Sequence, residues 1–153
     1  IASAHICMFS PRQRGVLNDP LMPGDPSCYR RTGYCGGVAP GAPSAKYVAG
    51  QEIDVLFQQN LNHWMNTRPG YFDISIAYTR DPSNDDFETL ARMSDYAAHD
   101  QVFQSNFTLT VKLPPKSTSH GVIRLRYVSN NPDEIDPKNN TDAVFYNCAD
   151  VEV

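Results

Sequence analysis

The sequence has no excess of positive charge, no long apolar run and none of the short motifs that mark the commonest enzyme sites. Its net charge is -4, and no basic stripe is present to neutralise phosphates, which argues against a nucleic-acid partner. No apolar run approaches the roughly 20 residues that a membrane-spanning helix needs. CxxC, HExxH, glycine-rich phosphate-loop and nucleophile-elbow patterns are all absent, so the usual zinc, protease and nucleotide interpretations have no support.

The length and the covalent features indicate one secreted domain. The 153 residues, of which 41% are hydrophobic, suffice for a single core, and we expect one domain over residues 5–153. Two glycosylation acceptor patterns occur, at Asn106 and Asn139. Together with four cysteines and 12 prolines, they favour an extracellular domain that carries disulfides.

The first four residues carry a processing signal. Residues 2–4 read Ala-Ser-Ala, the small-x-small pattern after which signal peptidase cuts. Residues 1–4 would then be the remnant of a signal peptide, and His5 would be the first residue of the product. The alternative is that Ile1 is the mature terminus or is left from expression.

Alternating apolar and polar residues predict a protein made of strands. About six or seven short strands joined by loops indicate an all-β fold, an antiparallel β-sandwich. One short helix is predicted over residues 85–93, where Phe87, Leu90 and Ala91 have helical spacing behind acidic residues. The clearest strands are residues 5–9, 51–57, 71–78, 106–113, 121–128 and 143–153.

Residues 16–43 form a long irregular segment rich in Pro, Gly and Asp. A loop of this length needs anchors, and Cys28 and Cys35 are the obvious ones. Four cysteines allow three pairings, and the residues alone leave the choice open.

Histidine is the residue type left to do chemistry. Imidazole with few sulfur ligands suits copper or zinc. His63 follows a strand at the start of a loop, from where its ring could point out of a rigid scaffold. His99 lies in a polar segment and is expected to be solvated, while His120 opens a strand and is expected to be a structural or surface residue. The fourth histidine, His5, follows the cleavage pattern.

Several short motifs, taken in order, resemble the lytic polysaccharide monooxygenases. The similarity spans His5 to Val153 and is greatest with the chitin- and cellulose-active animal and bacterial branches. The sequence is also similar to compact copper-binding proteins of fungi that share their fold. The resemblance implies an immunoglobulin-like sandwich that holds one copper ion in a histidine brace. The motifs are the histidine after the cleavage pattern, Gly33-Tyr34-Cys35-Gly36-Gly37, Asn62-His63 followed by Gly70-Tyr71-Phe72, and Phe145-Tyr146-Asn147-Cys148-Ala149-Asp150-Val151.

The brace that this resemblance implies uses two histidines. His5 would bind copper through its backbone amine and its ring, and His63 would give a third nitrogen, a tetragonal set that suits Cu(II). With Ala4 attached, the His5 nitrogen is an amide and a poor donor, so the complete brace requires a chain that begins at His5. Phe145 would match the aromatic residue on the axial side, although a core position is its alternative. Strand alternation would turn Tyr146 the other way.

The resemblance also implies the disulfides. It suggests Cys35 with Cys148, which leaves Cys7 with Cys28, and the local pair of Cys28 with Cys35 is the rival.

Residues 64–69 are inserted relative to the family, next to the expected copper face. Trp64 could therefore contact a substrate, or the insertion could block a flat polysaccharide surface. Tyr29 and Tyr34 are the other aromatic candidates for stacking on a sugar, and packing within their own loop is the simpler expectation for both.

Three functions remain open. The first is a secreted copper monooxygenase that oxidatively cleaves a β-linked polysaccharide such as chitin. The second is a copper-binding protein of the same fold without catalysis. The third is an extracellular matrix or structural sandwich that has lost the metal, and an extension that is retained ahead of His5 would favour it.

Overall fold

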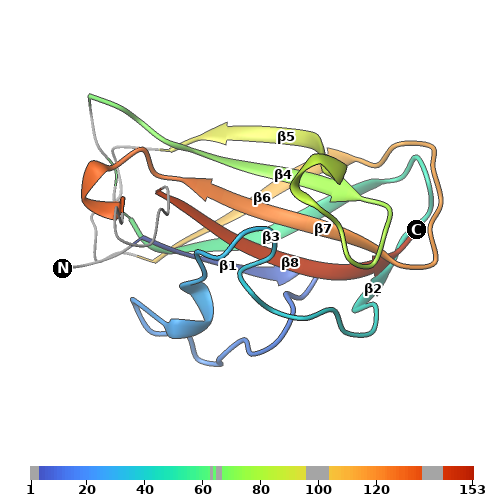
Figure 1. Cartoon of the computed structure of the whole chain (residues 1–153), viewed down its shortest axis with the longest axis horizontal. Coiled ribbons are helices and arrows are strands. Elements are labelled where there is room, and N and C mark those ends of the chain that lie inside the picture. Colours follow the sequence, from blue (N-terminus) through green and yellow to red (C-terminus); the bar gives the residue numbers. More distant parts are fainter. Residues whose placement is uncertain (1–3, 63, 65–66, 96–103, 136–142) are drawn as a thin grey trace.

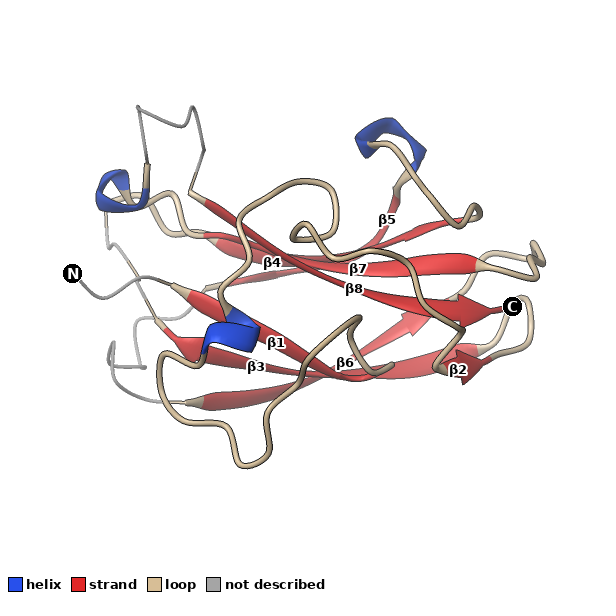
Figure 2. Cartoon of the chain, turned by 60° about the horizontal axis from the view of Figure 1, so that its bottom comes forward, coloured by secondary structure: helices blue, strands red, loops and turns tan. Residues whose placement is uncertain are grey.

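The protein is a sandwich of two facing sheets, as seen edge-on in Figure 2. The computed structural model describes residues 4–62, 64, 67–95, 104–135 and 143–153. One sheet has three strands in the order β1 (His5–Ser10), β3 (Glu52–Leu61) and β6 (Ser105–Lys112). The other has five strands in the order β2 (Ala45–Lys46), β8 (Val144–Glu152), β7 (Gly121–Val128), β4 (Tyr71–Ala77) and β5 (Glu88–Ser94). The short β2 runs parallel to β8, and the other described pairings are antiparallel.

Alternation along each strand decides which side chains enter the core. In β3, Val55 and Phe57 are fully buried, whereas Asp54 and Leu56 face solvent. Successive side chains of a strand point to opposite faces, so this pattern places one face of β3 against the second sheet. The fold class predicted from the sequence, an antiparallel β-sandwich, is confirmed.

The second half of β3 is buried on both faces because the long loop covers its outer side. The side chain of Asn60 is fully buried, and its amide donates to the carbonyl of Met22 at 2.9 Å. The loop thereby replaces solvent over the last residues of β3, from Gln58 to Leu61.

Aromatic rings run through the middle of the core. Phe57 and Phe72 lie 5.6 Å apart between ring centroids, Phe72 and Tyr127 lie 4.7 Å apart, and Tyr127 and Phe145 lie 6.2 Å apart. Contacts of this kind add to the stability that burial of the rings provides. They connect the three-stranded sheet to β8.

The predicted helix over residues 85–93 is wrong. Residues 84–86 form a single 3-10 turn, η2 (Asn84–Asp86), and the chain then forms β5, which pairs with β4. Leu90 and Met93 of β5 pack against the core from a partly buried edge strand. Ladder hydrogen bonds to β4 and this packing outweigh a weak helical pattern. In the described part of the chain, no helix is long and apolar enough to cross a membrane.

Two disulfides fasten the long loop to the sandwich. Cys7 of β1 is bonded to Cys28 in η1 (Pro26–Cys28), and Cys35 is bonded to Cys148 of β8. This pairing agrees with the one that the family resemblance implied. The bridges span 21 and 113 residues of sequence.

Candidate functional site

The candidate site lies at the end of the sandwich where β1 begins. His5 is the first residue of β1 and pairs with Leu61, the last residue of β3. The turn that contains η3 (Pro132–Glu134), drawn in orange, lies at this same end in Figure 1. His63 follows Leu61 by two positions in the sequence, and it lies outside the described residues.

Tyr29 covers His5. The two ring centroids are 4.9 Å apart, and the ring of Phe145 lies 5.7 Å from that of Tyr29. The ring of His5 is held in this contact, with 8% of the residue exposed. Cys28 precedes Tyr29 and is bonded to Cys7, two residues from His5, so the disulfide brings this tyrosine to the site.

The position of Tyr29 differs from the expectation of packing within its own loop. The signal that could have found it is the pairing of Cys7 with Cys28, which ties the neighbours of Tyr29 to the neighbours of His5. Tyr34, in contrast, is about half exposed and lies away from these rings, beside the disulfide of Cys35.

Phe145 is a core residue that also borders the site. It is fully buried, contacts the ring of Tyr127 and lies under the guanidinium of Arg31, 5.4 Å from ring centroid to Cζ. Tyr146 faces the opposite side of β8, where Arg124 lies 5.7 Å from its ring centroid. The alternation expected for these two aromatic residues is therefore seen in the structure.

The residue that precedes β1 is packed into the sandwich. Ala4 is fully buried, and its backbone N–H donates to Oε1 of Glu134 at 2.7 Å. Glu134 is 2% exposed, and its backbone carbonyl accepts a hydrogen bond from the guanidinium of Arg31. A buried carboxylate thus meets the main chain next to His5. Nothing in the sequence around Glu134 indicated this contact, because it joins residues 130 positions apart.

A buried polar network fixes the chain on both sides of position 63. The amide of Asn62 donates to Oε1 of Gln59 at 3.1 Å and to Oδ1 of Asp95 at 3.3 Å. Asp95 also accepts from Nε2 of Gln59 at 3.1 Å and from the hydroxyl of Tyr127 at 2.5 Å. The backbone N–H of Trp64 donates to Oδ1 of Asn62. The network therefore holds Asn62, and Asn62 in turn holds the backbone of Trp64, on either side of position 63 in the sequence.

The remaining predicted positions are distributed over the fold. Trp64 is partly buried next to this network, and Asn106 is exposed on β6. Asn139 and His99 lie outside the described residues. Within the described ranges, no group of three His, Cys, Asp or Glu side chains could hold a metal ion.

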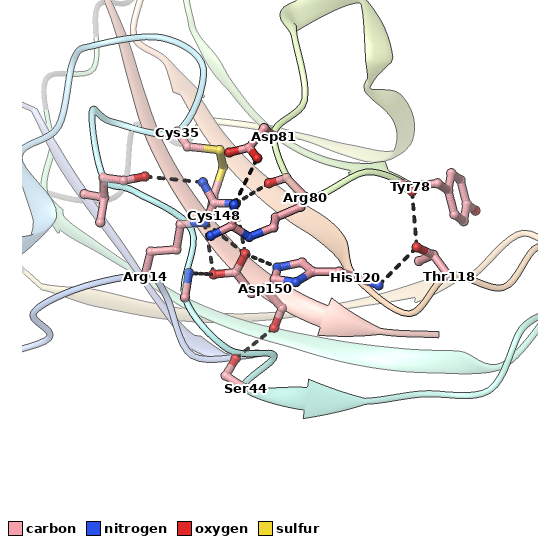
Figure 3. A network of polar contacts seen from close by, with 12 residues as sticks. Arg14, Cys35, Ser44, Tyr78, Arg80, Asp81, Thr118, His120, Cys148 and Asp150 are labelled. Atoms are coloured by element: carbon pink, nitrogen blue, oxygen red, sulfur yellow. Dashed lines mark hydrogen bonds and ion pairs between the residues drawn. A yellow bond between two sulfur atoms is a disulfide. The ribbon is translucent and has the colours of Figure 1, made fainter.

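His120 belongs to a different cluster, near the far end of β8 (Figure 3). Its Nε2 lies 2.8 Å from Oδ1 of Asp150, a carboxylate that also accepts from Nη2 of Arg14 at 2.9 Å. Arg14 donates in addition to the carbonyls of Val38 and Arg80. His120 thus has a structural role, as its place at the start of a strand suggested.

The ion pair of Arg14 and Asp150 is almost completely withdrawn from water. Their side chains are 4% and 3% exposed. Burial alone would raise the pKa of Asp150, but hydrogen bonds from Arg14, His120 and the backbone of Gly41 outweigh it and hold the pKa below its ordinary value of 3.8. The cluster joins the long loop to β7 and β8.

Comparison with known proteins gives a likeness of structure. No protein-family model matches the sequence, and no curated protein matches it. An AA10 lytic polysaccharide monooxygenase from Streptomyces lividans is 13% identical, with a TM-score of 0.55 over 97% of this chain and 100% of that chain. A CBM33 polysaccharide monooxygenase is 15% identical, with a TM-score of 0.57 over 97% of this chain and 99% of the other. This chain therefore has the β-sandwich fold of the AA10 lytic polysaccharide monooxygenases along almost its whole length.

Proposed function

We propose that this protein is a secreted copper-binding protein whose chain, once cut after Ala4, holds one copper ion between His5 and His63 and oxidatively cleaves a β-linked polysaccharide such as chitin. The observation that carries the proposal is the pairing of His5 with Leu61 at one end of a monooxygenase-like sandwich. His63 follows Leu61 by two residues in the sequence. His63 thus follows, in the sequence, the strand that pairs with the strand beginning at His5.

The donors available at this end suit copper. After cleavage, His5 would supply its ring and its terminal amine, and His63 would supply a second imidazole. Three nitrogen ligands that leave positions open favour the tetragonal geometry of Cu(II). Copper, once bound, would supply the one-electron redox chemistry that activates oxygen or peroxide for attack on a glycosidic carbon.

The neighbouring residues have supporting roles. Tyr29 holds the ring of His5 in place through its contact at 4.9 Å, and Phe145 supports Tyr29 from the core. The hydrogen bonds of Asn62 with Asp95 and with the backbone of Trp64 hold the two residues on either side of position 63. Ligands positioned by packing and by a second layer of hydrogen bonds bind metals more tightly than ligands on free loops.

The substrate side of the proposal rests on aromatic residues near the site. Tyr29 is 37% exposed while it covers His5, so one part of it remains available to a ligand. Trp64 follows His63 directly in the sequence and is partly buried. Aromatic faces pack well on the apolar faces of sugar rings, which suits an extended polysaccharide.

The test is product analysis with the processed protein. A copper-loaded chain that begins at His5 is incubated with chitin, a reductant and peroxide, and the soluble products are identified by mass spectrometry. We expect oxidised oligosaccharides from this chain and from a His99→Ala control. We expect none from His63→Ala. An absence of oxidised products from several polysaccharides, despite bound copper, would leave copper binding alone and refute the catalytic part.

A second function, a structural sandwich without metal, is favoured by one observation. Ala4 is fully buried and donates to Glu134, so a chain that retains Ala4 fits the fold. Such a chain has an amide at His5 and cannot form the complete brace. Mass spectrometry of the terminal peptide of the naturally secreted protein separates the two functions, since the monooxygenase must begin at His5 and the scaffold keeps Ala4.

A further inference from the structure

A pocket on the outer side of the three-stranded sheet has no part in the proposed copper site. Its volume is about 390 Å³, at the lower end of the range for small-molecule sites. It lies between residues 17–21 of the long loop and the outer face of β3. The residues that line it include Phe9, Arg12, Leu17, Asp19, Gln58 and Gln104.

The inner wall of this pocket is fixed by side-chain amides. Gln58 is 8% exposed, and its Oε1 accepts from Asn60 at 2.9 Å and from Gln104 at 3.2 Å. Gln104 also donates to the carbonyl of Leu21 at 3.0 Å, which ties the loop wall to the sheet. The pocket is therefore formed before any ligand arrives, which lowers the entropic cost of binding.

The chemistry of the lining suits a sugar ring. The amides of Gln58 and Gln104 bond to one another in the inner wall, and the carboxylate of Asp19 and the guanidinium of Arg12 add an acceptor and a donor to the lining. Phe9 and Leu17 add apolar surface. A pyranose offers this same mixture, with hydroxyl or acetamido groups around its rim and C–H groups on its faces.

A glycosylation acceptor pattern lies directly beside the pocket. Asn106 of the sequence Asn106-Phe107-Thr108 is exposed on β6, and Thr108 is exposed on the same face. The amide of Gln58 donates to Oδ1 of Asn106 at 2.9 Å. This bond engages the oxygen and not Nδ2, the nitrogen to which an N-linked sugar is attached. The bond is thus compatible with glycosylation, and a sugar on Asn106 would begin one side chain away from the pocket wall.

We propose that this pocket binds a pyranose ring that carries hydroxyl and acetamido groups. The ring can come from an N-linked glycan on Asn106 or from a free saccharide, since both present the same chemistry. The site lies on the outer face of β3 and β6, and it requires neither copper nor processing after Ala4. Sugar binding in this pocket can therefore be tested independently of the copper site.

The first arm of the test examines the attached sugar. The full chain is secreted from a eukaryotic host, and hydrogen–deuterium exchange of residues 17–21 is compared before and after enzymatic removal of the glycan. We expect slower exchange with the glycan in place. Gln104→Ala should abolish that difference while the glycan stays attached, whereas Gln51→Ala, an exposed glutamine outside the pocket, should preserve it. A chain without sugar at Asn106 would remove this source and leave the decision to the second arm.

The second arm examines a free sugar. The trisaccharide of N-acetylglucosamine is titrated into the unglycosylated full chain, and its binding is measured by calorimetry. A site that holds one ring predicts a Kd on the order of millimolar. Arg12→Ala should weaken this binding, while Arg80→Ala, a matched surface arginine outside the pocket, should not. Binding in either arm that depends on the pocket residues supports the proposal and identifies the source. Exchange that is independent of the glycan, together with no pocket-dependent titration, would overturn it.

Discussion

Tyr29 and His5 are brought together by a disulfide rather than by strand pairing. Their ring centroids lie 4.9 Å apart, although the residues are separated by the start of the long loop. The bridge between Cys7 and Cys28 joins the immediate neighbourhood of each. A covalent link thus positions an aromatic ring over the proposed metal ligand.

Replacement of Tyr29 should separate the role of its ring from that of its hydroxyl. Tyr29→Ala removes ring contacts to His5 and Phe145, so the free energy of unfolding should fall by about 1–2 kcal/mol. Tyr29→Phe retains both contacts and should remain within about 0.5 kcal/mol of the native protein. Urea unfolding measures both values. Equal losses for the two variants would mean that the hydroxyl, and not the stacking, stabilises the site.

The two disulfides should differ in their effect on the site. On the chain-entropy estimate, loss of the bridge between Cys35 and Cys148 should cost about 4–5 kcal/mol, and loss of the bridge between Cys7 and Cys28 about 3 kcal/mol. Only the bridge between Cys7 and Cys28 holds Tyr29 over His5. Paired cysteine-to-alanine variants of each bridge should therefore show that the less costly change causes the greater loss of copper affinity. The reverse order would contradict the role given to Tyr29.

Asp95 should be essential for the end of β3. It accepts hydrogen bonds from Asn62, Gln59 and Tyr127, so Asp95→Ala leaves several buried donors without this acceptor. We expect a loss of about 2–4 kcal/mol in the free energy of unfolding, together with weaker copper binding. Asp54→Ala, on the exposed face of β3, is the control, and it should change the free energy of unfolding and the copper affinity only slightly. Unchanged copper affinity in a folded Asp95→Ala protein would show that the network does not organise the site.

Acid should weaken the cluster around Asp150. Hydrogen bonds from Arg14 and His120 depress its pKa in the folded state, so its stabilising contribution is full above its ordinary pKa of 3.8. That contribution is lost as the pH falls through the lower, folded pKa. The free energy of unfolding should thus decline below about pH 4, and Asp150→Asn should flatten this decline.

The same substitution has a cost at neutral pH. Asp150→Asn leaves the buried guanidinium of Arg14 without its counter-charge, which should lower stability by about 3–5 kcal/mol. His120→Ala removes one partner of Asp150 from a partly exposed position and should cost about 0.5–1.5 kcal/mol. Urea unfolding across the acid range provides both comparisons. If the free energy of unfolding falls as steeply below pH 4 in Asp150→Asn as in the native protein, a group other than Asp150 causes the decline.

Local pattern predicted most of the strands, and long-range contact explains where it failed. The alternation in the first half of β3 and in β6 is regular because one face of each packs on the core. In β5 the apolar residues Leu90 and Met93 are few, and the pairing with β4 decides the conformation. A pattern read along the chain does not contain that pairing.

The candidate site was only partly accessible to sequence reasoning. His5 and Phe145 could be proposed from short motifs that resemble a known family. Glu134 could not, because its contact with Ala4 joins segments 130 positions apart and no motif surrounds Glu134. Tyr29 required knowledge of the disulfide partner of Cys28. His63 remains a prediction from the sequence.

The most direct test of the copper site is the Cu(II) affinity of two forms of the protein. Isothermal titration, with electron paramagnetic resonance for the nitrogen ligands, compares a chain that begins at His5 with one that begins at Ile1. We predict one tightly bound copper ion for the His5 form, and binding weaker by at least about 100-fold for the Ile1 form and for His63→Ala in the His5 form. Equal affinity in the two forms, or an unchanged affinity in His63→Ala, would contradict the histidine brace.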